Sequence, residues 1–137
     1  MSFTYKLVAV LNKEIDTGVA MNALAHMTLG LGSQVEKEML RFDTYETRDG
    51  VSFPYISQMP FMILRGKSSE IRKAVKGARE QQMVYDVFVE TMTGGTYLEQ
   101  LARTKEQEES NLTYYGAVIF GPWDEVSLLT KRFSLYK

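Results

Sequence analysis

The one histidine of the chain, His26, lies in residues 16–31, whose apolar spacing predicts a helix, and Asn22 precedes it by one helical turn. An asparagine that binds one imidazole nitrogen fixes the tautomer and leaves the other nitrogen free to act as a base. His26 is therefore a candidate catalytic residue and Asn22 a candidate ligand-binding residue. The alternative is a structural imidazole that packs on the rim of the core and binds a backbone carbonyl.

A second candidate, Glu90, comes at the end of a predicted strand, residues 84–91, and opens a glycine-containing loop at 92–96. In α/β sheets, ligands bind beyond the carboxyl ends of strands, so Glu90 is placed for acid–base work. The loop adds hydroxyl groups and close backbone approach through Thr91, Thr93, Gly94 and Thr96. Arg65, which closes another predicted strand, or loop amides would stabilise a developing negative charge. An ordinary strand-exit loop is the alternative.

Composition excludes several kinds of chemistry. The 137 residues hold no cysteine and one histidine, so disulfides, a thiol nucleophile and thiolate or histidine metal sites are not expected. We also expect no cofactor, since the chain has no P-loop, GxGxxG or GxSxG motif. The net charge of −1 draws the chain to neither nucleic acid nor membrane. Without an apolar run of about 18 residues or a signal peptide, a cytoplasmic protein with no membrane contact is expected.

The pattern along the chain predicts one domain, residues 1–137. The predicted strands and the predicted helices alternate: a buried strand at 5–12, a helix at 16–31 ended by Gly30 and Gly32, a hairpin at 40–56 with an Asp49-Gly50 turn, a strand at 59–65, a helix at 68–81, a strand at 84–91, a polar helix at 97–110, a strand at 113–120 and a helix at 123–131. Helices between strands favour parallel crossovers. We therefore predict an α/β domain with a mixed, mostly parallel sheet of four to five strands flanked by helices.

A basic cluster at residues 65–79 offers a different function. One face of the predicted helix carries Arg72, Lys76 and Arg79, which could bind the phosphate groups of a nucleic acid. The cluster has no accompanying RNA-recognition motif, and a solvated helix face explains it more simply. Nucleic acid is thus an expected partner only under the alternative hypothesis.

Four segments resemble a known family: LVAVLNKEIDTGVAMNALAHMTLGLG, DGVSFPYISQMPFMILRG, VFVETM and YYGAVIFGPWDEVSLLTKRFSLYK. Together they are similar to an uncharacterised bacterial domain family whose fold is that of type II peptidyl-tRNA hydrolases. The resemblance covers nearly the whole chain. It implies a compact mixed sheet of four or five strands flanked by helices, and a homodimer.

The resemblance breaks at the catalytic residues of the hydrolases. Their first helix carries a lysine, two alanines, a glutamine and, three residues on, a histidine. Anchored on His26, the lysine position holds Val19 and the glutamine position holds Ala23. Their aspartate–alanine–glycine sequence has its nearest match in Glu90-Thr91-Met92, and Arg65 could correspond to a basic residue closing a strand. The resemblance therefore implies the hydrolase scaffold with an altered site, and not peptidyl-tRNA hydrolysis.

Two hypotheses follow from the sequence. The first is a protein that binds an unknown small-molecule ligand, or hydrolyses it, through His26 and Glu90. The second is a non-catalytic module that binds RNA or an acidic partner through the basic helix at 65–79.

Overall fold

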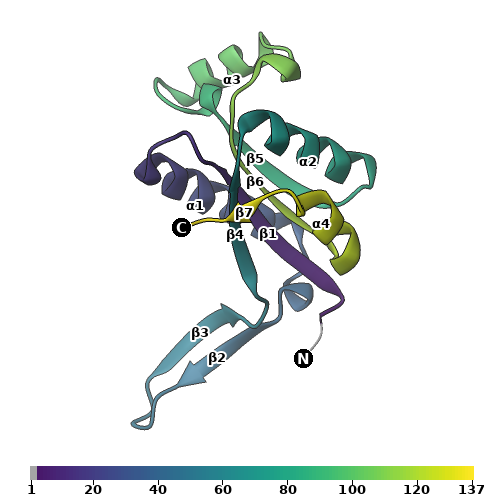
Figure 1. Cartoon of the computed structure of the whole chain (residues 1–137). Helices are drawn as coiled ribbons and strands as arrows, with labels where there is room; N and C mark the ends of the chain where they lie inside the picture. Colours follow the sequence, from purple (N-terminus) through teal and green to yellow (C-terminus); the bar gives the residue numbers. More distant parts are fainter. Residues whose placement is uncertain (1–2) are drawn as a thin grey trace.

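A strand buried on both faces, β1 (Tyr5–Asn12), lies in the middle of the main sheet of the computed structural model, which describes residues 3–137. Its odd-numbered side chains pack with α1 (Thr17–Gln34), and its even-numbered ones with α2 (Ser68–Glu80) and α4 (Trp123–Thr130). Helices therefore cover both faces of the sheet (Figure 1). A near-continuous apolar run is what such a strand requires, so this prediction is confirmed.

The other elements are η1 (Lys37–Leu40), β2 (Phe42–Glu46), β3 (Ser52–Ser57), β4 (Phe61–Gly66), β5 (Val84–Val89), η2 (Glu90–Met92), α3 (Tyr97–Lys105), η3 (Glu109–Asn111), β6 (Tyr114–Pro122) and β7 (Ser134–Leu135). The predicted elements occur in the predicted order, and the structure adds the short helices η1, η2 and η3 and the strand β7. Residues 3–137 thus form a single α/β domain with four α-helices, a five-stranded sheet and a separate hairpin. No helix in this range is long and apolar enough to cross a membrane.

The prediction of a mostly parallel sheet is wrong. The strand order is β5-β6-β1-β4-β7, and β1 and β4 are its one parallel pair. β5 runs in the same direction as β1, but the antiparallel β6 lies between them. A parallel crossover needs a helix that packs on the sheet and returns the chain to the starting end. α3 buries none of its residues, so the chain doubles back and β6 pairs antiparallel with β5.

The hairpin formed by β2 and β3 stands apart from the sheet (Figure 1). Its strands pair across the Asp49-Gly50 turn, as the sequence predicts, and Gly50 has a φ of 91°, which favours glycine. The register shifts beside Pro54, where Tyr55 takes a φ of 61°. Proline cannot donate to a ladder, so this return strand leaves the main sheet.

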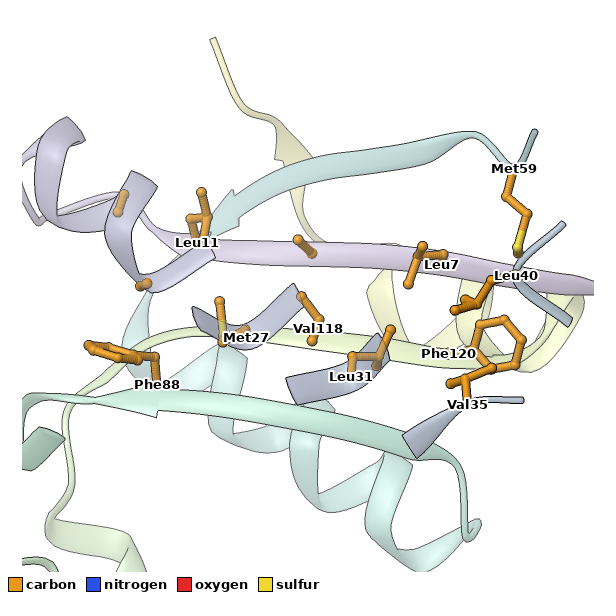
Figure 2. Packing of buried hydrophobic residues seen from close by; sticks show 13 residues of the cluster. Leu7, Leu11, Met27, Leu31, Val35, Leu40, Met59, Phe88, Val118 and Phe120 are labelled. Carbon is orange, nitrogen blue, oxygen red and sulfur yellow. The ribbon is translucent and has the colours of Figure 1, made fainter. Parts of the chain in front are cut away.

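One apolar cluster packs α1 against the main sheet. Figure 2 shows it between α1 and the sheet, with Phe88 at one end and Leu40 and Met59 at the other. Met27 and Leu31 are almost fully buried here, each at most 2% exposed. Because interiors are close-packed, this contact fixes α1 firmly against β5 and β6.

α1 is longer than the sequence indicates. The helix continues past Gly30 and Gly32 to Gln34, so the prediction that these glycines end it is wrong. Both glycines take ordinary helical φ values, and Gly30 instead allows a close approach: a Cβ there would lie 2.1 Å from Asp86 Oδ2. The glycine is therefore a contact between α1 and β5.

Candidate functional site

An open cleft of about 780 Å³ lies between α1, β5 and α3. It is lined by Asn22, His26, Asp86, Val87, Phe88, Met92, Thr93, Gly94, Tyr97, Gln100, Leu101 and Thr104. Its volume is within the usual range for small-molecule sites. The segment from β5 to α3, which is far from α1 in the sequence, therefore converges on the predicted histidine.

α1 brings His26 and Asn22 to the cleft on one stripe, which Gly30 continues one turn further on. The core residues Ala23 and Met27 lie on the neighbouring stripe and hold the helix against the sheet. Both predicted side chains are exposed and available to a ligand. No hydrogen bond joins them within residues 3–137, so Asn22 does not set the tautomer of His26 in this state.

The His26 imidazole is positioned by an aromatic ring instead. It stacks on Phe88 of β5, with ring centroids 5.6 Å apart and an interplanar angle of 29°. Phe88 in turn stacks on Tyr115 of β6, at 6.4 Å. A buried phenyl ring behind an exposed imidazole fixes the ring plane and leaves the nitrogen atoms free for a ligand.

Asp86 supplies the carboxylate of the cleft. It lies two residues before Phe88 on β5, so both side chains point to the same face of the strand. Its Oδ1 accepts a hydrogen bond from the Val87 N–H at 2.8 Å. Burial raises the pKa of the Asp86 carboxyl above its ordinary value, although this hydrogen bond opposes the rise. Its Oδ2 faces Gly30, one helical turn beyond His26 or roughly 6 Å along α1.

The remaining wall is formed by η2 and α3. Gly94 and Gly95 each have a φ of 70° and turn the chain from η2 into α3, and Thr96 caps the helix by accepting a hydrogen bond from Glu99 N–H. Arg103 donates to the backbone carbonyls of Thr91, Thr93 and Gly94 at 3.2, 2.6 and 2.9 Å. These bonds hold α3 to the loop, although no residue of α3 is buried.

The end of α3 is tied to α2 through η3. Arg79 binds the Glu109 carboxylate with two hydrogen bonds, at 2.6 and 3.0 Å, and Tyr114 O–H donates to the same group at 2.6 Å. These partners, Arg79 first, lower the pKa of Glu109 to about 2. Arg72 also donates to Ser110 O at 2.7 Å. The connection that carries α3 is thus anchored at both of its ends.

The structure brings four of the eight predicted site residues to the cleft: His26, Asn22, Thr93 and Gly94. Thr93 Oγ1 donates to Glu90 O at 2.6 Å, which closes the η2 turn. Gly94 lies where the loop meets α3 and allows the backbone to approach a ligand closely.

The other four predicted residues lie elsewhere and have structural contacts. Glu90 does not line the cleft, because its carboxylate accepts a hydrogen bond from Thr113 N–H at 2.6 Å and joins η2 to the residue that precedes β6. Thr91 is buried, with its hydroxyl 2.6 Å from that of Thr104, and Thr96 is the cap of α3. Arg65 is exposed on β4, with β1 and β6 between it and β5.

Asp86 is the residue that the sequence interpretation missed. An acid within the otherwise apolar strand 84–89 was the available indication, because a charged group there must find a polar environment or a function. The α3 residues Tyr97, Gln100, Leu101 and Thr104 had no comparable indication. Within residues 3–137, no group of three or more His, Cys, Asp or Glu side chains is placed to hold a metal ion.

Comparison with known proteins gives a family but no activity. No curated protein matches the sequence. The solved structure of a protein of unknown function, Atu0240 of Agrobacterium tumefaciens strain C58, is similar with a TM-score of 0.86 and 16% sequence identity, over 99% of this chain and 100% of its own. At that identity the likeness shows a shared fold. The family described as "Protein of unknown function (DUF2000)" matches residues 5–137, and the chain belongs to this family.

Proposed function

We propose that this protein binds a small organic molecule in the cleft between α1, β5 and α3, and that His26 is the acid–base group of a hydrolytic site. The observation that carries the proposal is the convergence of the one imidazole, a carboxylate and two carboxamides, those of Asn22 and Gln100, in one cleft of about 780 Å³. Apolar clefts with a few convergent polar groups are the usual form of small-molecule sites.

The charge of the cleft indicates the class of ligand. Asp86 is its one acid, and neither lysine nor arginine lines it among the described residues. A phosphate or carboxylate would meet negative charge there without a compensating cation. Phe88, Met92 and Leu101 offer apolar contact beside these polar groups. The ligand we propose is therefore neutral or cationic, with an apolar body and a polar head.

His26 and Asp86 could divide the acid–base work. In hydrolysis, an imidazole nitrogen would take a proton from the attacking water, and the nearby Asp86 carboxylate would stabilise the imidazolium that forms. The amide hydrogens of Asn22 or Gln100 are the donors available to a developing oxyanion. Gln100 Nε2 already donates to Gly94 O at 3.2 Å, which orients that side chain toward the loop.

The likeness to type II peptidyl-tRNA hydrolases stays a prediction for the fold, and we propose that their activity is absent. Ala23, at the glutamine position, is fully buried in the core, and Val19, at the lysine position, does not line the cleft. Neither position offers a polar group to a reacting ester. We expect no peptidyl-tRNA cleavage at a rate comparable with those enzymes, as measured by the release of free peptide and uncharged tRNA.

The basic helix is the weaker candidate for function. Arg72 and Arg79 donate to the η3 segment, and Glu109 places a negative charge beside them. The Glu109 carboxylate offsets the charge of Arg79, so α2 offers less positive charge to RNA or an acidic partner. We therefore assign ligand binding to the cleft.

The proposal is tested by nuclear magnetic resonance, because one histidine gives one imidazole signal. A library of neutral and cationic fragments should yield ligands that shift the His26 ring signal and the backbone amides of Asn22, Asp86 and Gln100. His26→Ala should weaken these ligands at least tenfold and leave thermal stability nearly unchanged. Thr17→Ala is the matched control, because Thr17 is exposed on the same helix and lies outside the cleft.

Catalysis has its own readout. Neutral and cationic nitrophenyl esters and anilides should be hydrolysed by the parent protein and not by His26→Ala. Ligands that gather on α2, or that bind His26→Ala as tightly as the parent, would contradict the proposal. A loss of several kcal/mol of stability in His26→Ala would assign the histidine a structural role instead.

A further inference from the structure

The β2–β3 hairpin exposes an unusual amount of apolar surface. Six of its large apolar side chains are between 38% and 63% exposed: Phe42, Tyr45, Val51, Phe53, Tyr55 and Ile56. The hairpin projects from the body of the protein, and neither strand packs extensively against another element (Figure 1). A two-stranded hairpin alone is at best marginally stable in water. We call residues 42–57 the arm.

The arm nevertheless has a defined shape. Tyr45 and Phe53 are direct partners across the two strands, so their rings lie on the same face. At its base, Phe42 packs edge-on against Tyr55 at 6.4 Å, and the Lys37 ammonium lies 4.7 Å from the centre of the Tyr55 ring. A preformed aromatic surface loses little conformational entropy when a partner covers it.

A second unpartnered apolar surface lies on α1. Its outer stripe forms a shallow groove of about 600 Å³, lined by Met21, Leu24, Ala25, Thr28, Leu29 and Gly32. Met21 is 65% exposed and Leu29 78% exposed. The helix has no charged residue in its 18 positions, which is unusual for a helix with an exposed side. We call this surface the α1 groove; it does not share residues with the His26 cleft.

We propose that the arm of one protein molecule packs into the α1 groove of a second copy, and the reverse, in a symmetric homodimer. Each chain offers one arm and one groove, so a two-fold axis pairs both surfaces of both chains. In this arrangement the ring of Phe53 lies against Leu29 of the second copy, and the flexible Met21 side chain of the same groove adapts to it. A different partner on either surface would leave the other one exposed.

The area of the two surfaces agrees with this assignment. With about 150–250 Å² for a large apolar side chain, the exposed parts of the arm, Met21 and Leu29 come to about 800 Å² per chain. Stable protein–protein interfaces bury about 800 Å² on each partner. Either surface alone falls short of that area, and the two together reach it.

Sedimentation equilibrium between 10 and 100 µM tests the association. The parent protein should be a dimer. Phe53→Glu on the arm and Leu29→Glu in the groove should each raise the dissociation constant at least tenfold without changing the circular dichroism spectrum. Leu128→Glu on α4, 63% exposed and outside both surfaces, is the matched control and should remain dimeric.

The absence of cysteine allows a direct test of the contact. Phe53→Cys protein mixed with Leu29→Cys protein should form a disulfide-linked heterodimer under mild oxidation. A bond between these two different chains shows that the arm of one chain contacts the α1 groove of the other. Mixing Leu128→Cys with Leu29→Cys should not. A monomeric parent protein, a dimer unaffected by both glutamate variants, or failure of the 53–29 link in a dimeric sample would each overturn the proposal.

Discussion

α1 and α2 cover opposite faces of the same sheet, and they differ in what lies on their outer sides. α2 follows the ordinary rule for a surface helix: Ile71, Ala74, Val75 and Ala78 are buried, and charged residues face outward. α1 has an equally buried stripe in Ala20, Ala23, Met27 and Leu31, but no charged residue anywhere. Folding requires only the buried stripe, and the two uncharged outer stripes of α1 are the surfaces for which we propose binding roles.

The largest expected effect tests whether the two buried stripes are equivalent. Met27→Ala and Ile71→Ala should each lower the free energy of unfolding by about 3 kcal/mol, because each leaves a cavity at a side chain that is at most 1% exposed. Urea denaturation measures both. The exposed change Leu128→Ala should cost less than about 0.5 kcal/mol. A cost below about 1 kcal/mol for Met27→Ala alone would mean that α1 is loosely attached.

The next largest effect compares two glycines of α1, one that faces β5 and one that faces open space. Gly30→Ala should destabilise the protein by about 1–3 kcal/mol, because its Cβ would lie 2.1 Å from Asp86 Oδ2 and force the carboxylate or the helix to move. Gly32→Ala should stabilise it by about 0.5–1 kcal/mol, since nothing lies within 4 Å of that Cβ. Thermal denaturation compares the two. Equal effects would show that Gly30 does not hold α1 and β5 at their close approach.

A smaller effect concerns the charged side of α2. The pKa of Glu109 falls from its ordinary 4.5 to about 2 in the folded protein, because Arg79 and Tyr114 donate to its carboxylate. The stabilisation is therefore present above pH 4.5 and is lost as the pH falls toward 2. Because the Arg79 and Glu109 side chains are each more than 40% exposed, solvent screening limits the stabilisation to about 1 kcal/mol. Glu109→Gln should remove this part of the acid dependence of unfolding, measured by urea denaturation from pH 2 to 6.

The smallest effect concerns Asp86 and has the opposite sign. Burial raises the pKa of this carboxyl, so the folded state binds the proton more tightly than the unfolded state. The free energy of unfolding therefore falls as the pH rises from the ordinary pKa of an aspartate to the raised pKa of Asp86. Asp86→Asn should keep the hydrogen bond from Val87 N–H and raise stability at neutral pH by less than about 0.5 kcal/mol. A loss of stability in this variant at pH 7 would show that the charged carboxylate is held by favourable contacts.

The sequence predicts the elements better than their arrangement, for a physical reason. The run of residues 5–12, the Asp49-Gly50 turn and the apolar stripe of α2 are local patterns, and the structure confirms each. The position of β6 between β1 and β5 depends on contacts between distant segments, which no local pattern contains. The expectation of parallel crossovers therefore failed where α3 does not pack on the sheet.

The same distinction explains the site. His26 and Asn22 were predicted from helical spacing, and they line the cleft together with Thr93 and Gly94. The strand end at Glu90 predicts a site residue, but the direction of its side chain depends on Thr113, which lies on a neighbouring segment. The role of Asp86 in the cleft depends on the α1–β5 contact at Gly30, which is visible only in three dimensions.

The strand order also has a consequence for the speed of folding. Val8 pairs with Met62 on one side and with Ile119 on the other, so the centre of the sheet joins segments from the beginning, middle and end of the chain. The arm is the only strand pair in residues 3–137 that a tight turn closes. Pairing between such distant segments makes folding slower than that of a helical bundle, whereas a hairpin such as the arm closes on the microsecond timescale.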